Sequence, residues 1–254
     1  MSASLSRAFP ARKLRPSAKV RLVCFPYAGG GASVFRNWQA QIPGDIEVCA
    51  FEPPGRETRF RDPICTTFDE LVGGAVSAIL GGLCDKPIAL FGHSLGARVA
   101  FEVARRIAAT QPGQPLCLIA SGTRGPGVVP RDAPIHALPH AEFVAKLREL
   151  EGTPTAVLEN PELLEIYEPI LRADFMLSET YRYEPGSVVT CPVSAYGGIE
   201  DKSVTSDDVG RWREIAGGSF AMRRFPGNHF FLHKVQATLL EAVARDVFAA
   251  SSPR

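Results

Sequence analysis

A serine between two glycines is the residue of this chain best suited to covalent chemistry. Residues 92–96 read Gly-His-Ser-Leu-Gly, after the apolar run 88–91 and before a stretch of helical composition at 97–109. A serine on a tight strand-to-helix turn needs minimal neighbours, and the helix N-terminus directs N–H groups towards developing negative charge. The pattern therefore predicts Ser94 as a nucleophile. The alternative is a glycine-rich turn with an idle serine.

A hydroxyl needs a base before it becomes a nucleophile, and the chain has five histidines. His93 lies on the turn itself, so we expect its side chain to point away from the serine. His136 and His140 fall in a helical insertion described below. His229 follows the last predicted strand through a Pro-Gly-Asn loop, which fits the chain order serine, acid, histidine. We predict His229 as the general base, with His233 as the alternative.

The acid that orients the histidine should follow an earlier strand. Two adjacent acids, Glu200 and Asp201, come directly after the predicted strand 193–196. The residues alone leave both open. Asp207 and Asp208 are expected to cap the next helix instead.

An oxyanion hole needs two N–H donors, and two loops can supply them. One donor should be the amide of Leu95, directly after the nucleophile. The other should come from the loop that follows strand 19–25, where three glycines allow close approach of the backbone. We predict the Ala28 amide, with Tyr27 as the alternative. A phosphate-binding loop is disfavoured, because no Gly-Lys-Ser/Thr follows these glycines.

Short apolar runs alternate with helical patterns, which predicts a mostly parallel sheet flanked by helices in an α/β fold. The predicted strands are 19–25, 47–51, 87–91, 116–120, 193–196 and 220–225. Helices are predicted to begin near Ser33, Thr67, Ser94, Asp207 and His233.

One long segment interrupts this alternation. Residues 122–192 contain no convincing strand, while 141–150 and 161–183 have helical spacing. We predict one domain, 1–254, with a core at about 18–124 and 187–250 and a helical lid insertion at about 125–186. The alternative is a pair of ordinary crossover helices.

Composition narrows the partners and the compartment. A net charge of +1 over 254 residues gives no reason to expect a nucleic-acid partner. No apolar run reaches the ~18 residues of a membrane span, and the N-terminus lacks the apolar core of a secretory signal. Six scattered cysteines without a CxxC pair suggest a cytoplasmic protein without disulfides, with Cys24 and Cys117 buried in strands. The basic N-terminal residues Arg7, Arg12, Lys13 and Arg15 are expected to form a solvated tail.

Six segments together resemble type II thioesterases, the discrete editing enzymes that accompany polyketide and nonribosomal peptide synthases. They read CFPYAGGGAS (24–33), PPGRE (53–57), GHSLGA (92–97), LRADF (171–175), ETYRY (179–183) and NHFFL (228–232). The resemblance runs from about Val20 to Leu240 and implies the α/β-hydrolase fold. It also implies a triad of Ser94, Asp201 and His229, beneath a helical lid that shapes an acyl pocket. This chain departs from the family pattern at Leu95, Lys202 and Asn228.

The resemblance implies hydrolysis of acyl thioesters on the phosphopantetheine arm of an acyl or peptidyl carrier protein. No carrier or condensing domain is recognised in the sequence, so we expect the protein to act in trans, and we expect a monomer. No cofactor or metal is expected, since the paired histidines lack partnering cysteines or an HExxH form. Carrier proteins are usually acidic, so docking could use the basic candidates Arg56, Arg59, Arg61 and Arg98, which could equally be ordinary surface charge. Alternatives are a general carboxylesterase or medium-chain fatty-acyl thioesterase, a cyclising enzyme, and a non-catalytic scaffold of the same fold.

Overall fold

Six strands form one parallel sheet in the computed structural model, which describes residues 3–251. Their order across the sheet is β2-β1-β3-β4-β5-β6. The predicted fold class is confirmed, and each predicted strand overlaps an observed one. The strands are β1 (Val20–Phe25), β2 (Ile46–Ala50), β3 (Ile88–His93), β4 (Cys117–Ser121), β5 (Val193–Gly198) and β6 (Phe220–Phe225).

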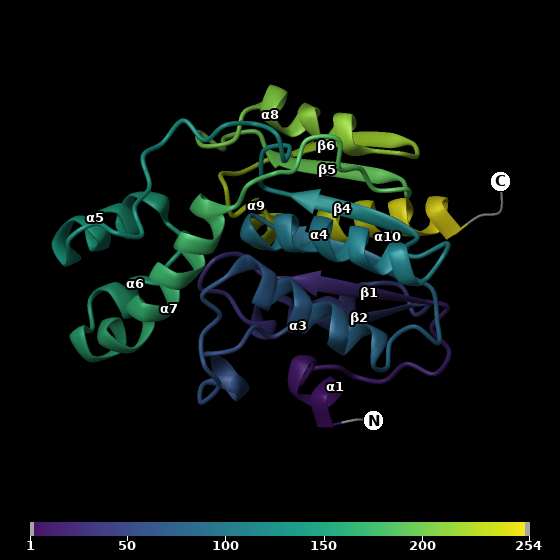
Figure 1. Ribbon diagram of the computed structural model, residues 1–254, viewed down its shortest axis with the longest axis horizontal. Coiled ribbons are helices and arrows are strands. Elements are labelled where there is room, and N and C mark those ends of the chain that lie inside the picture. Colours follow the sequence, from purple (N-terminus) through teal and green to yellow (C-terminus); the bar gives the residue numbers. More distant parts are fainter. Residues whose placement is uncertain (1–2, 252–254) are drawn as a thin grey trace.

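Helices cover both faces of the sheet (Figure 1). The longer ones are α3 (Phe68–Leu80), α4 (Leu95–Thr110), α5 (His140–Leu150), α7 (Pro161–Thr180) and α10 (Gln236–Ser251). The shorter ones are α1 (Ala3–Ala8), η1 (Ala32–Phe35), α2 (Trp38–Gln41), η2 (Glu57–Arg59), α6 (Thr155–Leu158), α8 (Ser206–Gly210), η3 (Arg211–Ile215) and α9 (Phe231–Lys234). Within residues 3–251, no helix combines the length and apolar character that a membrane span requires.

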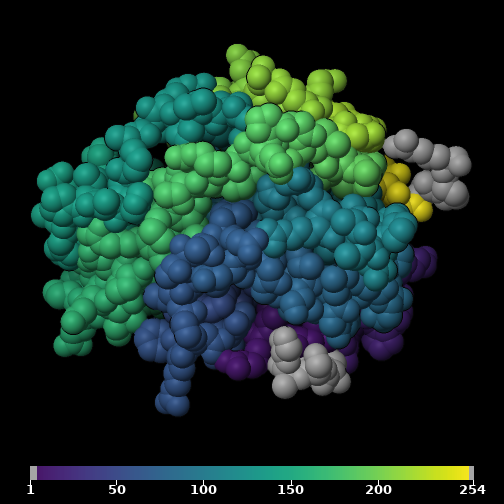
Figure 2. All heavy atoms as spheres, in the orientation of Figure 1, coloured from purple at the N-terminus to yellow at the C-terminus, as the bar shows by residue number. Residues whose placement is uncertain are grey.

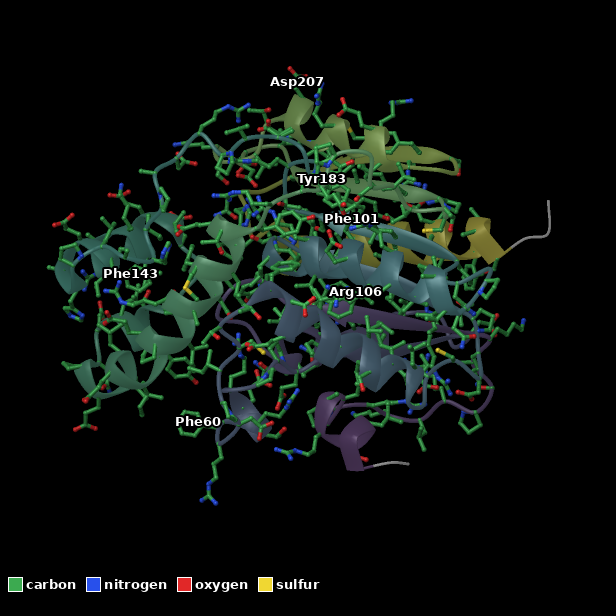
Figure 3. All side chains as sticks on the ribbon, viewed as in Figure 1. Phe60, Phe101, Arg106, Phe143, Tyr183 and Asp207 are labelled. Atoms are coloured by element: carbon green, nitrogen blue, oxygen red, sulfur yellow. The ribbon has the colours of Figure 1, made fainter. Side chains whose placement is uncertain are left out.

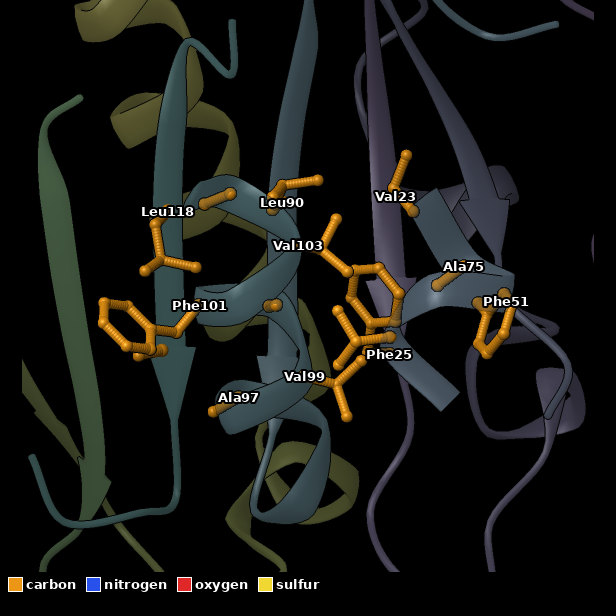
Figure 4. Close-up of a cluster of buried hydrophobic side chains, with 14 of the residues drawn as sticks. Val23, Phe25, Phe51, Ala75, Leu90, Ala97, Val99, Phe101, Val103 and Leu118 are labelled. Carbon is orange, nitrogen blue, oxygen red and sulfur yellow. The ribbon is translucent and has the colours of Figure 1, made fainter. Parts of the chain in front are cut away.

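Alternate residues of the central strands feed two hydrophobic cores. Along β1, Val23 and Phe25 join the core beneath α3 and α4, whereas Leu22 and Cys24 join the core beneath α2 and α10. Figure 4 shows the first core, with side chains of β1, β3 and β4 facing those of α4. Burial on both faces explains why these strands appear in the sequence as continuous apolar runs rather than alternating ones.

Helices α5, α6 and α7 lie between β4 and β5 in the chain, in the segment predicted as an insertion. They project to one side of the sheet and form the left-hand part of the molecule in Figures 1 and 2. Phe143, Leu147 and Leu164 belong to a hydrophobic cluster of their own. The chain returns to the sheet at Tyr183, whose ring lies 6.2 Å from that of Phe101 on α4 (Figure 3).

The N-terminal segment differs from its prediction as a solvated tail. Leu5, Ala8 and Phe9 are each less than 5% exposed and join the core beside α3. Arg12 forms a salt bridge with the buried Glu47 of β2. The prediction was wrong because the four basic residues obscured three apolar ones spaced along one helical face.

Candidate active site

Ser94 occupies a strained turn between β3 and α4. Its backbone has φ 55° and ψ −117°, a conformation rare for a residue with a side chain. A Cβ on Gly92 would lie 2.0 Å from the carbonyl oxygen of Gly96, and a Cβ on Gly96 would lie 2.2 Å from that of Phe25. Both glycines are therefore required by backbone packing. The strand, turn and helix predicted around Ser94 are all present.

Asp201 and His229 form a hydrogen-bonded pair at the same edge of the sheet. His229 Nδ1 lies 2.8 Å from Asp201 Oδ2, and the Asp201 side chain is 2% exposed. Burial alone would raise the pKa of Asp201, but hydrogen bonds from His229 and Ser203 outweigh it and hold the pKa below its ordinary value. Asp201 is therefore ionised and fixes His229 Nδ1 as a donor. Nε2 is left as the ring nitrogen that can accept a proton.

The neighbouring acid, Glu200, points elsewhere. Its side chain is 60% exposed and lies 3.9 Å from Lys234. Asp208 is the third residue of α8 and forms a capping box with Thr205 at the start of this helix, where the sequence predicted a capping role. Of the two acids left open by the sequence, Asp201 is the one that contacts His229.

His93 links the loop of Ser94 to the loop of His229, a role that the sequence did not indicate. Its ring is fully buried, with Nε2 3.0 Å from the backbone oxygen of His229 and Nδ1 2.9 Å from Ser121 Oγ. Burial holds the pKa of His93 well below its ordinary value, and the nearby His229 lowers this pKa further. Because Ser94 is the next residue in the chain, this contact ties the predicted nucleophile to the loop that carries the predicted base.

The glycine-rich loop after β1 turns back at the same edge. Gly30 N donates to Tyr27 O at 2.9 Å, closing a turn across Ala28 and Gly29. Leu95 is the first residue of α4. Within residues 3–251, neither the Ala28 nor the Leu95 amide donates to a protein acceptor. Both predicted donors are therefore free of protein acceptors, as an oxyanion hole requires.

The other histidines are engaged away from Asp201. His233 Nε2 lies 3.0 Å from the hydroxyl of Tyr27. His136 pairs with Glu179 of α7, and His140 Nδ1 lies 2.6 Å from Glu168 of the same helix.

The basic residues considered for carrier docking have different environments. Arg56 is 4% exposed and paired with Asp174, so its assignment to a docking surface is wrong. Arg59 pairs with Asp62 at 2.8 Å, and the partly buried Arg98 donates to the Ser178 carbonyl. Of the four candidates only Arg61 is exposed. Its neighbour Phe60, 55% exposed, lies at the edge of the molecule in Figure 3.

Comparison with known proteins gives a consistent result. A family model described as a thioesterase domain matches residues 20–250. The gramicidin S biosynthesis protein GrsT of Aneurinibacillus migulanus is 37% identical over 238 residues, which are 94% of this chain and 93% of that protein. The crystal structure of ClbQ from the colibactin NRPS/PKS pathway aligns with a TM-score of 0.86 and 30% identity, over 92% of this chain and 99% of that one. The type II thioesterase BorB from the borrelidin biosynthetic cluster aligns with a TM-score of 0.81 and 31% identity, over 93% and 94% of the two chains.

Proposed function

The chain belongs to the thioesterase family, and from that membership we propose how its residues act in a type II thioesterase of nonribosomal peptide and polyketide pathways. The enzyme hydrolyses acyl groups bound as thioesters to the phosphopantetheine arm of an acyl or peptidyl carrier protein. This editing reaction removes groups that block the synthase. The observation that carries the catalytic assignment is the buried Asp201–His229 pair, joined through His93 to the turn of Ser94.

Ser94 Oγ attacks the thioester carbonyl while His229 Nε2 accepts its proton. The C–S bond then breaks, and His229 returns the proton to the departing thiol of the carrier arm. Water attacks the acyl-enzyme by the reverse route and releases the free acid, which restores Ser94. Asp201 stays ionised throughout and stabilises the imidazolium that forms in each half-reaction.

The Ala28 and Leu95 amides bind the oxyanion of each tetrahedral intermediate. Each such donor typically stabilises the transition state by about 3 kcal/mol. A thiolate is already a good leaving group, so specificity depends mainly on which acyl chains reach the site and fit it.

Helices α5 to α7 act as the lid over this site. Their segment contacts two loops that carry proposed site residues, the loop of His229 and the glycine-rich loop after β1. Asn228 Nδ2 donates to Glu151 Oε2 at 2.8 Å, and the Phe230 ring packs against Gly152. On the other side, the Leu171 side chain of α7 packs on Gly29. Acyl chains that enter the site must therefore pass between these helices and the loops of the sheet domain.

The test is release of free acid from a panel of acyl carrier proteins, by wild-type enzyme and by Ser94→Ala. We expect cleavage of short acyl units from several carriers, lost in Ser94→Ala together with labelling by a fluorophosphonate probe. Turnover of free esters without cleavage from carriers would contradict the proposed substrate and favour a general esterase. Labelling that persists in Ser94→Ala would contradict the nucleophile.

A further inference from the structure

A buried ion pair joins three segments that are far apart in the chain. Arg56 follows β2, and Asp174 lies on α7, with 4% and 3% of their side chains exposed. The pair is bidentate: Arg56 Nη2 donates to Asp174 Oδ1 at 3.0 Å, and Nη1 donates to Oδ2. The third segment is the glycine-rich loop after β1, which both side chains contact.

Stability alone is a weak reason for such a pair. Removing two charges from water costs about as much as their attraction returns, and apolar residues of similar volume often serve equally well. The contacts with the third segment give a more specific reason. Asp174 Oδ2 accepts from Gly29 N at 2.7 Å, and Arg56 Nη1 donates to Gly30 O at 3.3 Å. The ion pair therefore binds the backbone of the loop at two successive residues.

These contacts fix the direction of the Ala28 amide. Gly29 has φ +77°, the positive value that a type II turn requires at its third residue. The Tyr27 carbonyl points into this turn, where it accepts from Gly30 N. A trans peptide holds its N–H opposite its C=O, so the N–H of Ala28 must point out of the turn. A turn held at Gly29 and Gly30 thus holds the Ala28 N–H in one direction.

We propose that Asp174 and Arg56 are positioning residues for the oxyanion hole, acting through Gly29 and Gly30 on the Ala28 amide. This inference rests on the proposed function, in which Ala28 binds the oxyanion. Because Asp174 belongs to α7, the hole is fully assembled only while this helix is docked on the loop. Leu171, three residues earlier on α7, packs on the same glycine and keeps the helix in this position.

Two double variants separate the contact with Gly29 from the charge pair. Arg56→Met with Asp174→Leu removes both charges and the acceptor of the Gly29 amide. Arg56→Met with Asp174→Asn removes the same charges but keeps an acceptor oxygen on a side chain of similar size. A matched control is Arg223→Met with Asp246→Asn, which removes the partly buried pair between β6 and α10, away from the catalytic loops.

The measurements are the melting temperature, kcat and KM on an acyl carrier protein, and the affinity for an alkylboronic acid. The boronic acid forms a tetrahedral adduct with an active serine and needs the same N–H donors. We expect the leucine variant to lose at least about tenfold in both kcat and boronic acid affinity, with little change in KM, since removing an oxyanion donor costs ~10²–10³. The asparagine variant should recover most of both losses, and the control pair should change neither.

Equal kcat and adduct affinity in the leucine variant and the wild type would overturn the proposal. So would an asparagine variant no better than the leucine variant, because the effect would then come from the charges alone. If the leucine variant does not fold, Arg56→Lys provides the test. A lysine ammonium is a compact charge without the planar fork that holds both carboxylate oxygens and the Gly30 carbonyl, so we expect at least about threefold lower kcat and adduct affinity. Unchanged values would overturn the proposal.

Failure of the proposed function gives a different result. A wild type that binds the boronic acid through Ser94 but cleaves no carrier-bound thioester would contradict the substrate assignment. The adduct affinities of the variants would still test the positioning role, because they do not depend on the carrier.

Discussion

The backbone oxygen of His229 accepts a hydrogen bond from His93 Nε2, 3.0 Å away. This bond fixes the tautomer of His93. A carbonyl oxygen can only accept, so Nε2 carries the proton, and Nδ1 accepts from the Ser121 hydroxyl, 2.9 Å away. A neutral ring satisfies both contacts, whereas a protonated ring would place a positive charge in a fully buried site. The burial of His93 is thus matched to the neutral form.

The free energy of unfolding should therefore decrease on acidification, and His93 should cause part of this decrease. Its pKa in the folded protein lies well below 6.5, so below pH 6.5 the unfolded chain takes up a proton that the folded chain does not. The contribution of this residue is complete above pH 6.5 and decreases by about 1.4 kcal/mol per pH unit below it. Urea unfolding of the wild type and His93→Gln between pH 7.5 and 5 measures this. Parallel stability profiles for the two proteins would contradict the neutral, buried assignment.

Asp201→Asn should reduce kcat by a factor on the order of 10³–10⁴, because the amide no longer stabilises the imidazolium and can hold the wrong tautomer. KM should change little, since the buried carboxylate is engaged by His229 and by the amides of Ser203 and Val204. Glu200→Gln is the matched control: its exposed side chain should be removable without loss of kcat. Steady-state kinetics on an acyl carrier protein measure both. A large loss in Glu200→Gln with an active Asp201→Asn would transfer the role to the neighbouring acid.

The two histidines four residues apart should differ sharply. His229→Ala removes the proposed base and should reduce kcat by a factor on the order of 10⁴ or more. His233→Phe removes one hydrogen bond to the Tyr27 hydroxyl, worth ~1 kcal/mol, and should reduce kcat less than about tenfold. The initial rate of thiol release from the carrier compares them. Comparable losses would mean that His233 contributes more than support for Tyr27.

Local patterns predicted the elements, but the choice between adjacent residues needed the fold. The sheet was predictable because strands buried on both faces appear as apolar runs between turns. The acid was ambiguous because Glu200 and Asp201 are neighbours in a loop. One local signal was available: Asp201 Oδ1 accepts from the amides of Ser203 and Val204, a short-range turn that Asp forms with the backbone two residues on.

Long-range pairs left no such signal. Arg56 and Asp174 are 118 residues apart in the chain. Nothing in the local sequence distinguishes a loop arginine that is buried and paired from one that lies at the surface. The role of His93 was also missed, because its partner is a backbone carbonyl that carries no sequence information. Such a pair forms only where the fold brings its two segments together. In this chain α7 packs on the loop after β1, which places Asp174 beside Arg56.

The glycines of the turn around Ser94 should tolerate no side chain. Gly96→Ala would bring a Cβ within 2.2 Å of the Phe25 carbonyl oxygen and 2.5 Å of that of Pro26. Both are backbone atoms, which cannot move aside as a flexible side chain can. We expect a loss of more than about 3 kcal/mol in unfolding free energy, beyond ordinary overpacking. Gly74→Ala on α3 is the opposite case, since a Cβ there meets nothing within 4 Å, and it should gain ~0.5–1 kcal/mol. Urea unfolding measures both, and a stable Gly96→Ala protein would contradict the packing around Ser94.

The N-terminal arm lies before the residues matched by the family model, which begin at position 20, yet it should contribute strongly to stability. Phe9 is 2% exposed and its ring lies 5.9 Å from that of Phe51 in an edge-to-face contact. Phe9→Ala should cost ~3–5 kcal/mol through lost burial and the cavity left behind. Leu14→Ala, at a residue 58% exposed, should stay within about 0.5 kcal/mol of the wild type.

Thermal and urea unfolding measure the stability of the two variants. The value of kcat, measured below the unfolding transition, checks that the proposed active site is intact. If Phe9→Ala were as stable as Leu14→Ala, the arm would be the solvated tail that the basic residues suggested. A loss of the expected size would show that the core of this enzyme extends beyond the family domain.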